Sequence, residues 1–393
     1  MSLIKSSATI GIFTLISRVL GFLRDVTIAS GLGASYLSDA FFVAFKLPNF
    51  LRRLFAEGAF NAAFVPMFAG MLAVEGKERA RRFSSEAMSY LLLILFIVTA
   101  VFIVCMPWLM YVLAPGFSAD ATKFELAISL TQITMPYIIF ISLVSLFGGI
   151  LNSGDKFAAV AATPILMNLC LILVPFVVGD LTPTGAHALA IAVLVAGVVQ
   201  WLWLLYFCRR RGMLPTLVRP RLTSDVKKLL LLIAPAALGA GVAQINLFID
   251  LIIASQFDGG VSYLYYADRI NELPLAVIGI AVGTALLPVL SRQIRTGDVE
   301  AAYQSQNKAI GFSLFLSLPS AMAIMVLAEP IIRVMFERGE FTAHDTTATY
   351  KALIAFAAGL PAFILIKILA PCFFANQDTK TPFKIATFCI VVN

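Results

Sequence analysis

Long apolar segments alternate with short polar breaks along the whole chain. Each segment approaches or exceeds the roughly 20 apolar residues that a transmembrane helix needs. Prolines and glycines interrupt several segments, which membrane helices tolerate. The pattern therefore predicts an all-α polytopic membrane protein with about ten complete spans and part of an eleventh, and it leaves no room for a sizeable soluble domain. The predicted spans lie near residues 3–29, 37–72, 86–113, 124–151, 157–178, 185–207, 229–256, 262–291, 306–336 and 347–374, and the next begins near Pro382.

Overall composition agrees with this class. Hydrophobic residues make up 60% of the chain and charged residues 13%, whereas soluble proteins carry about 25% charged residues. The first segment has the basic start and apolar run of a signal peptide, but no small-residue cleavage site follows it. Charged residues continue the segment instead, in SRVLGFLRD (17–25). We therefore expect this segment to remain as the first helix.

Residues typical of soluble enzymes and metal sites are scarce. The five cysteines are scattered without the paired spacing of a disulfide framework or a zinc site, and His187 and His344 are the two histidines. The pair Gly31-x-Gly33 lacks the third glycine of a dinucleotide motif, and the chain has no P-loop and no HExxH. We therefore expect no catalytic residue, no metal site and no cofactor.

The charge of the loops predicts the orientation of the chain. The even-numbered connections (75–82, 152–156, 208–228, 291–298 and 376–380) all carry Lys or Arg, whereas the odd-numbered stretches GLGASYLSD, APGFSADA, GDLTPTG and QFDGG carry none and ERGEFTAHD carries only Arg338. Because Lys and Arg accumulate in short cytoplasmic loops, the N-terminus is predicted to be cytoplasmic. The sequence pI of about 9.2 then reflects topology beside anionic membrane lipids and requires no nucleic acid.

An internal repeat emerges when proline and asparagine landmarks are aligned. An even number of spans separates matched positions, so the halves have the same orientation and form parallel repeats. This predicts an N-terminal lobe of six spans over residues 1–210, a basic cytoplasmic linker over 211–228 and a C-terminal lobe over 229–393. A copy of the first lobe would end near residue 433, obtained by adding an offset of about 223 to 210, so we expect the second lobe to be incomplete. The matched pairs are Pro66 with Pro288, Pro107 with Pro330, Pro136 with Pro361 and Asn152 with Asn376, at offsets of 222, 223, 225 and 224.

Several predicted spans contain charged residues. An Arg or Lys near the bilayer centre costs about 2.5 to 3.5 kcal/mol, so such residues normally face water or a partner. Two structural explanations stay open. Residues near span ends, Arg24 among them, can extend to the membrane interface. Alternatively, Arg24 or Arg269 can form an ion pair with Asp25 or Asp268 that holds the lobes together.

The stretch KLPNFLRRLFAEG (46–58) in the second predicted span has an ordered charge pattern. Lys46, Asn49, Arg53 and Glu57 follow helical spacing and share one face, and Arg52 borders it. We interpret this face as one wall of a central water-filled cavity between two helical lobes.

The sign of these intramembrane charges predicts the substrate class. Basic residues outnumber acidic ones, so the cavity is expected to be cationic and to attract an anion. Arginine in particular makes bidentate contacts with phosphate oxygens. An exporter of cations would show the opposite bias. The basic set is Arg18, Arg24, Lys46, Arg52, Arg53 and Arg269, and the acidic set is Asp25, Glu57, Asp268 and Glu272.

Four segments carry a resemblance to a known family. They are SRVLGFLRD (17–25), DAFFVAFKLPNFLRRLFAEGAFNAAFVP (39–66), YYADRINELP (265–274) and AVGTALLP (281–288). The chain resembles the MurJ/MviN family, bacterial lipid II flippases of the multidrug/oligosaccharidyl-lipid/polysaccharide exporter superfamily. The family has fourteen helices, and this chain is similar to about the first ten and the start of the next.

The resemblance implies that the chain moves undecaprenyl-diphosphate-linked peptidoglycan precursor, lipid II, from the cytoplasmic to the periplasmic leaflet of the bacterial inner membrane. It implies alternating access driven by the membrane potential, with a monovalent cation left open as a further driving ion. Its implied partners are lipid II, membrane lipids and the cell-wall synthesis machinery. The family's key basic positions fall on Arg18, Arg24, Arg52 and Arg269, which we assign to diphosphate binding together with Lys46, Asn49 and Arg53. We assign Asp25, Asp39, Glu57, Asp268 and Glu272 to ion pairs that change between conformational states.

Three other functions stay open from the sequence. A cation-coupled exporter of the same superfamily would depend on acidic rather than basic residues. A membrane enzyme that handles polyprenyl-linked glycans would use arginines too, but it would place them with a catalytic acid or base in large outer loops, and those loops are short here. A scaffold for cell-wall assembly would not need the intramembrane arginines at all.

Overall fold

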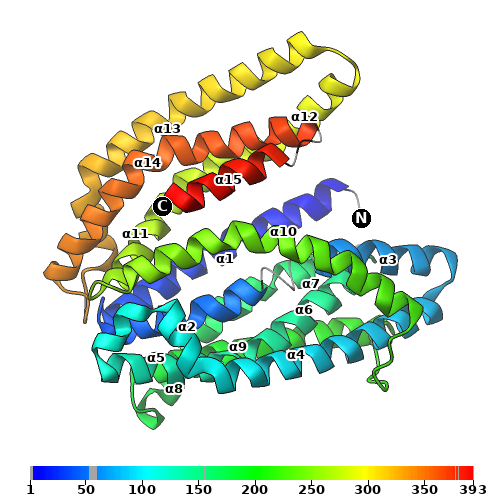
Figure 1. Ribbon diagram of the computed structural model, residues 1–393, viewed down its shortest axis with the longest axis horizontal. Coiled ribbons are helices and arrows are strands. Elements are labelled where there is room, and N and C mark those ends of the chain that lie inside the picture. The colour runs from blue at the N-terminus through cyan, green and yellow to red at the C-terminus, as the bar shows by residue number, and fades with distance from the viewer. Residues whose placement is uncertain (1–2, 53–59, 155, 377, 379, 393) are drawn as a thin grey trace. The chain divides into compact units, whose positions relative to one another are not determined.

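The structure is a computed structural model that describes residues 3–52, 60–154, 156–376, 378 and 380–392. Every regular element within these ranges is a helix (Figure 1). The chain forms two compact units. The first comprises residues 1–28 and 35–258, and the second comprises residues 29–34 and 259–393.

The first unit is a helical bundle in which α9 contacts α2, α5, α6 and α8, and α4 contacts α3, α5, α6 and α10. Small residues line α9, and the backbone approaches its neighbours closely at Gly197, where a Cβ would lie 2.8 Å from the Tyr137 ring. Such close approach of small residues drives helix association in membranes. The helices are α1 (Leu3–Leu32), α2 (Tyr36–Leu51), α3 (Phe60–Val74), α4 (Lys77–Leu113), α5 (Ala121–Thr134), α6 (Tyr137–Asn152), α7 (Phe157–Ala161), α8 (Thr163–Val178), α9 (Gly185–Arg210) and α10 (Ser224–Ala254), with short 3₁₀ turns η2 (Pro115–Ala119) and η3 (Gly179–Leu181).

Local sequence signals set where several of these helices begin. Ser35 caps α2 in a capping box with Ser38, and Asp120 accepts hydrogen bonds from the first backbone N–H groups of α5. Thr184 and Thr223 cap α9 and α10 in the same way. Each cap satisfies backbone donors that have no partner inside the helix, so the polar breaks in the sequence fix the helix starts.

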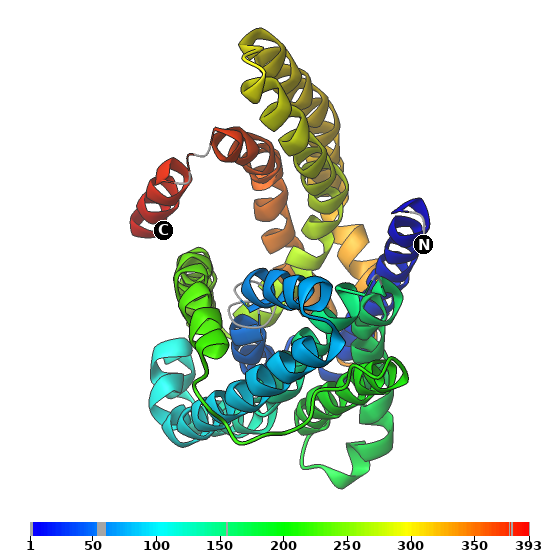
Figure 2. The same cartoon turned by 90° about the vertical axis from the view of Figure 1, so that its right-hand side faces the viewer.

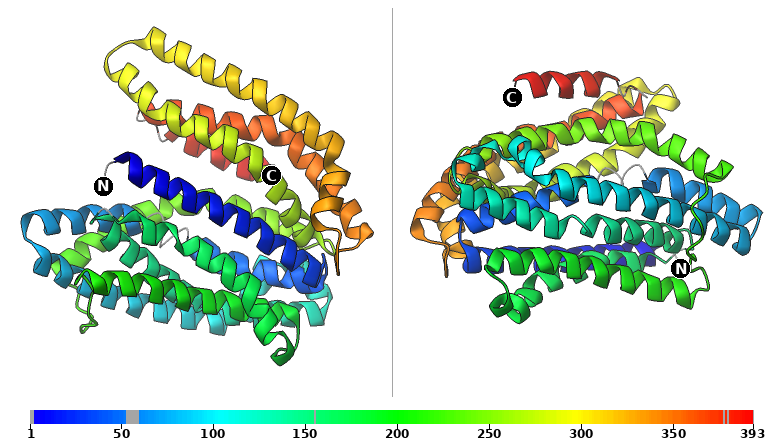
Figure 3. Two further views of the ribbon diagram at one scale, coloured as in Figure 1. Left: turned by 180° about the vertical axis from the view of Figure 1, so that it is seen from behind. Right: turned by 60° about the horizontal axis from the view of Figure 1, so that its bottom comes forward.

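The second unit is built around the antiparallel pair α13 and α14, drawn in yellow and orange in Figure 3. Its core contains Tyr266, whose ring lies 5.1 Å from Phe336 and 5.4 Å from Phe341. The end of α1 belongs here, because Glu340 donates a backbone hydrogen bond of 2.9 Å to the carbonyl of Ser30. The elements are α11 (Gly260–Pro274), a π-helical turn η4 (Leu275–Ile280), α12 (Ala281–Arg295), α13 (Val299–Phe336), α14 (Ala343–Ala375) and α15 (Lys380–Val392).

Connections of the first unit gather at two ends of its bundle. At one end, the backbone N–H of Gly116 donates to Ser255 Oγ at 3.2 Å, which joins two odd-numbered connections. At the other, Lys77 Nζ donates to the carbonyl of Arg211 at 2.8 Å, which joins two even-numbered ones. The 37 residues of α4 separate these ends by about 55 Å at 1.5 Å per residue. In this unit, these odd-numbered and even-numbered connections therefore lie at opposite ends of the bundle, as the orientation prediction requires.

The predicted fold class is confirmed. In the described parts of the ten predicted spans the chain is almost entirely helical, and α15 occupies the start of the eleventh. Among the described residues, seven segments are long and apolar enough to cross a membrane by length and composition. Helix bounds also follow the predicted period, since α4 and α13 start 299 − 77 = 222 residues apart and end 336 − 113 = 223 residues apart. The symmetry that would relate two lobes stays a prediction.

The boundary between compact units differs from the predicted linker at 211–228. The units divide between residues 258 and 259 because α10 packs against α3 and α4 in the first unit. The connection between α9 and α10, an extended green trace in Figure 2, is also bound to α4. The backbone N–H groups of Thr216 and Val218 donate to Ser85 Oγ and Ser89 Oγ at 2.9 Å each.

Candidate functional site

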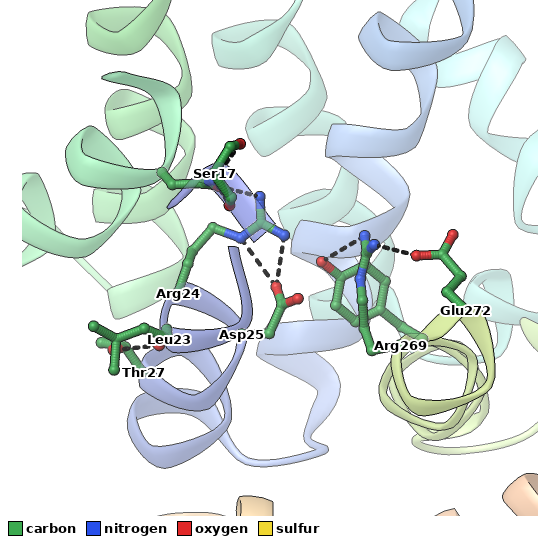
Figure 4. Close-up of polar contacts among 9 residues, drawn as sticks. Ser17, Leu23, Arg24, Asp25, Thr27, Arg269 and Glu272 are labelled. Atoms are coloured by element: carbon green, nitrogen blue, oxygen red, sulfur yellow. Dashed lines mark hydrogen bonds and ion pairs between the residues drawn. The ribbon is translucent and has the colours of Figure 1, made fainter. Parts of the chain in front are cut away.

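Arg24 is the most deeply enclosed of the predicted substrate-binding residues that the structure describes. Its guanidinium donates to Asp25 Oδ1 from Nε at 3.0 Å and from Nη2 at 2.7 Å (Figure 4). The two side chains are 11% and 2% exposed. Residue 24 lies eight positions before the end of α1, too far inside an apolar helix for its charge to be accommodated without partners. The ion pair therefore compensates the burial of the cation.

A second partner of Arg24 comes from another helix. Asn168 on α8 accepts a hydrogen bond from Arg24 Nη1 at 3.0 Å and donates from Nδ2 to the backbone carbonyl of Ser17 at 2.9 Å. Asn168 is not among the residues predicted from the sequence. The available signal was a single amide in the apolar run PILMNLCLILV (164–174), because a polar side chain there needs a hydrogen-bonding partner.

The remaining predicted residues of the first unit are placed less deeply. Arg52 is the C-cap residue of α2, and its Nε donates to Asn49 Oδ1 at 3.2 Å, so the two side chains lie together at the end of this helix. Lys46 is half-buried on α2, and Arg18 is exposed on α1. Arg53 and Glu57 lie outside the described residues.

Arg269, in the second unit, contacts two residues of its own helix. Its Nη1 donates to Glu272 Oε2 at 2.9 Å, and its Nη2 donates to the Tyr265 hydroxyl at 3.2 Å (Figure 4). The guanidinium carbon lies 4.8 Å from the centre of the Tyr265 ring, a cation–π contact. Asp268 is half-buried next to it on α11. Three residues beyond Glu272 the π-helical turn η4 begins, a departure from regular helix that is frequent at functional sites.

Asp39 forms a buried ion pair with Lys123, a partner that was not predicted from the sequence. Lys123 Nζ lies 2.8 Å from Asp39 Oδ2, and the two side chains are 4% and 0% exposed. The same ammonium lies 3.7 Å from Asp258 Oδ1 and 4.3 Å from the centre of the Phe117 ring. The pair joins α2 to α5 at the end of the bundle where odd-numbered connections meet. A lysine beside connections almost free of Lys and Arg was the signal that could have indicated it.

Comparison with known proteins identifies the family to which this chain belongs. A sequence profile described as lipid II flippase MurJ matches residues 28–393. The probable lipid II flippase MurJ of Rhizobium tropici is 46% identical to this chain, covering 100% of the chain and 74% of that protein. The chain belongs to the lipid II flippase MurJ family. The lipid II flippase MurJ of Burkholderia cenocepacia is 38% identical, covering 100% of the chain and 77% of its own length.

Solved structures agree with the MurJ assignment. The structure described as lipid II flippase MurJ in an inward closed conformation superposes with a TM-score of 0.83 at 30% identity, covering 97% of this chain and 79% of that one. An inward-facing multidrug resistance MATE family transporter superposes with a TM-score of 0.78 at 18% identity, a likeness of fold alone. This member of the MurJ family is a multi-pass membrane protein and a transporter rather than an enzyme.

The geometry of Arg24 bears on its two structural explanations. Its guanidinium is enclosed by Asp25 and Asn168, which favours an ion pair over extension to the membrane interface. Arg24 pairs with Asp25, and Arg269 pairs with Glu272. Both guanidinium groups therefore already contact a carboxylate, the chemical class closest to a phosphate in its demand for N–H donors. That such pairs hold the lobes together stays a prediction.

Proposed function

We propose that this chain is a lipid II flippase that moves undecaprenyl-diphosphate-linked peptidoglycan precursor from the cytoplasmic to the periplasmic leaflet by alternating access. Arg18, Arg24, Arg52 and Arg269 bind the diphosphate, assisted by Lys46, Asn49 and Arg53. The polyprenyl tail stays in the lipid during transfer. No covalent step is needed, because the head group enters and leaves unchanged.

The observation that carries this proposal is the enclosed guanidinium of Arg24. An arginine held inside an apolar helix costs free energy unless a partner or a substrate compensates its charge. Its Nε and Nη2 groups form a planar fork that matches a phosphate as well as a carboxylate. Asp25 holds this fork in the absence of substrate, and a diphosphate would exchange with it.

Exchange of ion-pair partners provides the proposed switch. When the diphosphate takes the guanidinium groups, Asp25 and Glu272 lose their present partners and become available for pairs that favour the opposite conformation. Asp39, Glu57 and Asp268 belong to the same set of acidic residues. A ligand shifts such an equilibrium only through different contacts in its two states, and these acidic residues supply that difference.

We place the protein in the bacterial inner membrane with its N-terminus in the cytoplasm, on the basis of the basic even-numbered connections. The membrane potential, negative inside, would return an empty cationic site inward with about 2.3 kcal/mol per charge per 100 mV. A monovalent cation is a second candidate driving ion, and cell-wall synthesis enzymes are candidate partners.

Accessibility of lipid II on the outer face of cells tests this function. Cells depleted of their own flippase and supplied with this protein should regain outer-face lipid II, measured by a membrane-impermeant enzyme that degrades it. A variant in which Arg18, Arg24, Arg52 and Arg269 are all alanine should not restore it. Full accessibility with that variant, at wild-type protein levels, would overturn the assignment and favour a scaffold. No recovery with the wild-type protein would contradict the flippase function.

A further inference from the structure

We propose that Asn168 is a positioning residue for substrate binding, which fixes the Arg24 guanidinium so that its Nε–Nη2 side can exchange Asp25 for a phosphate oxygen of the substrate. The proposal rests on the proposed function, because it takes the anion to be the diphosphate of lipid II.

Asn168 is bound on both sides of its carboxamide. It is 6% exposed, its Oδ1 accepts from Arg24 Nη1, and its Nδ2 donates to the Ser17 carbonyl. The orientation of the amide follows from its partners, since a guanidinium can only donate and a carbonyl can only accept. A longer, weaker contact of 3.5 Å joins Nδ2 to Ser17 Oγ. The side chain is therefore a fixed link between the backbone of α1 and the charge that α1 carries.

The surface of α1 is shaped to receive this amide. Ser17, Gly21 and Arg24 follow one another at i, i+4 and i+7 and so share a face of the helix. A Cβ at Gly21 would lie 3.4 Å from Asn168 Nδ2 and 3.8 Å from its Oδ1. This is ordinary van der Waals contact, so the amide packs directly on this face of α1 between Ser17 and Arg24.

Asp25 and Asn168 contact different edges of the guanidinium. The carboxylate takes the Nε–Nη2 edge, which is the fork that recognises anions, and the amide takes Nη1. An amide oxygen carries no net charge, so it does not neutralise Arg24 and does not compete with an anionic substrate for the fork. Asn168 can keep its hydrogen bond while Asp25 is replaced. Arginine has many rotamers to lose on binding, and an arginine held by a neutral partner has already lost them.

Binding by purified protein in lipid nanodiscs tests this role with two probes, lipid II and undecaprenol, which has the tail but no charged head group. Asn168→Ala should weaken lipid II binding by about tenfold, the usual effect of one hydrogen bond to a charged group, and leave undecaprenol binding unchanged. Asn168→Asp keeps the size of the side chain but adds a carboxylate that competes with the substrate, so it should weaken lipid II binding more than alanine does. In an Arg24→Lys background, Asn168→Ala should add less than a twofold effect, because Asn168 acts through the guanidinium.

Gln200→Ala is the matched control for a merely structural role. Gln200 is also a buried amide, and its Nε2 donates to the carbonyl of Thr163 at 2.7 Å, which links α9 to α8 away from the arginines. Its variant should retain the wild-type preference for lipid II over undecaprenol. If Asn168→Ala binds lipid II as wild type does, or weakens both probes equally, the positioning role is wrong. If the wild-type protein itself shows no preference for lipid II, the proposed function fails instead, and this inference with it.

Discussion

Arg24 and Arg269 are both predicted substrate-binding arginines, but the protein holds them in different ways. Arg24 contacts its sequence neighbour Asp25 and also Asn168 from α8, and its side chain is 11% exposed. Arg269 contacts Tyr265 and Glu272, both on its own helix, and is 33% exposed. The position of Arg24 therefore depends on how α8 packs in the first unit, whereas these two contacts of Arg269 depend on the local geometry of α11.

Replacing each arginine by alanine should give the largest contrast. Arg24→Ala removes the guanidinium from a buried carboxylate, a change that typically costs about 3 to 5 kcal/mol of stability. Arg269→Ala removes it from Glu272, which is 51% exposed, so the cost should stay within about 1 kcal/mol. Both variants should lose lipid II binding. Thermal unfolding in detergent and lipid II binding, measured on the same preparations, check the two parts of the prediction.

Equal losses of stability in the two variants would contradict the comparison. They would mean that the burial of Arg24 and its contact with α8 add nothing to stability. The additional variant Arg24→Ala with Asp25→Asn serves as the control. It removes the uncompensated charge and should recover part of the stability but none of the binding.

Lys123 separates the effect of burial from the effect of substrate binding. Its side chain is even less exposed than that of Arg24, but it lies among odd-numbered connections and pairs with Asp39. Lys123→Met retains the length of the side chain and leaves Asp39 without this cation, so stability should fall by about 3 kcal/mol. The loss of lipid II affinity, measured well below the unfolding temperature, should be much smaller than in Arg24→Ala, because Lys123 is not among the residues that bind the diphosphate.

A large loss of lipid II affinity in Lys123→Met would show that this end of the bundle takes part in binding. Arg333→Met is the matched control, because Arg333 pairs with Glu329 at 2.6 Å on the surface of α13 and is 57% exposed. That variant should change stability by less than about 1 kcal/mol.

The comparison also shows what could be predicted from the sequence. Arg24 and Asp25 are adjacent in SRVLGFLRD, and Arg269 and Glu272 are one helical turn apart, so both carboxylate partners lie within local reach. Asn168 is 144 residues from Arg24, and Lys123 is 84 residues from Asp39. Such partners depend on which helices pack together, and the hydropathy of a single chain does not contain that information.

The same distinction holds for the fold. Hydropathy predicted the helical spans because each helix satisfies its own backbone in an apolar solvent. It did not predict the division between units at residues 258 and 259, because α10 is assigned to the first unit by contacts with α3 and α4. A second local difference is that the helix breaks between α5 and α6 beside Pro136, whereas α14 continues through the corresponding Pro361.

The smallest expected effect concerns Tyr265, which contributes a ring and a hydroxyl to the environment of Arg269. Tyr265→Phe keeps the cation–π contact and loses one hydrogen bond of 3.2 Å, whereas Tyr265→Leu loses both. A hydrogen bond to a partly exposed cation and a cation–π contact at such a site are each worth about 0.5 to 1 kcal/mol. Lipid II affinity should therefore fall two- to fivefold in Tyr265→Phe and further in Tyr265→Leu, because each change frees rotamers that the substrate must then fix. If both variants bind lipid II as the wild type does, Tyr265 does not help to orient Arg269, and this prediction is wrong.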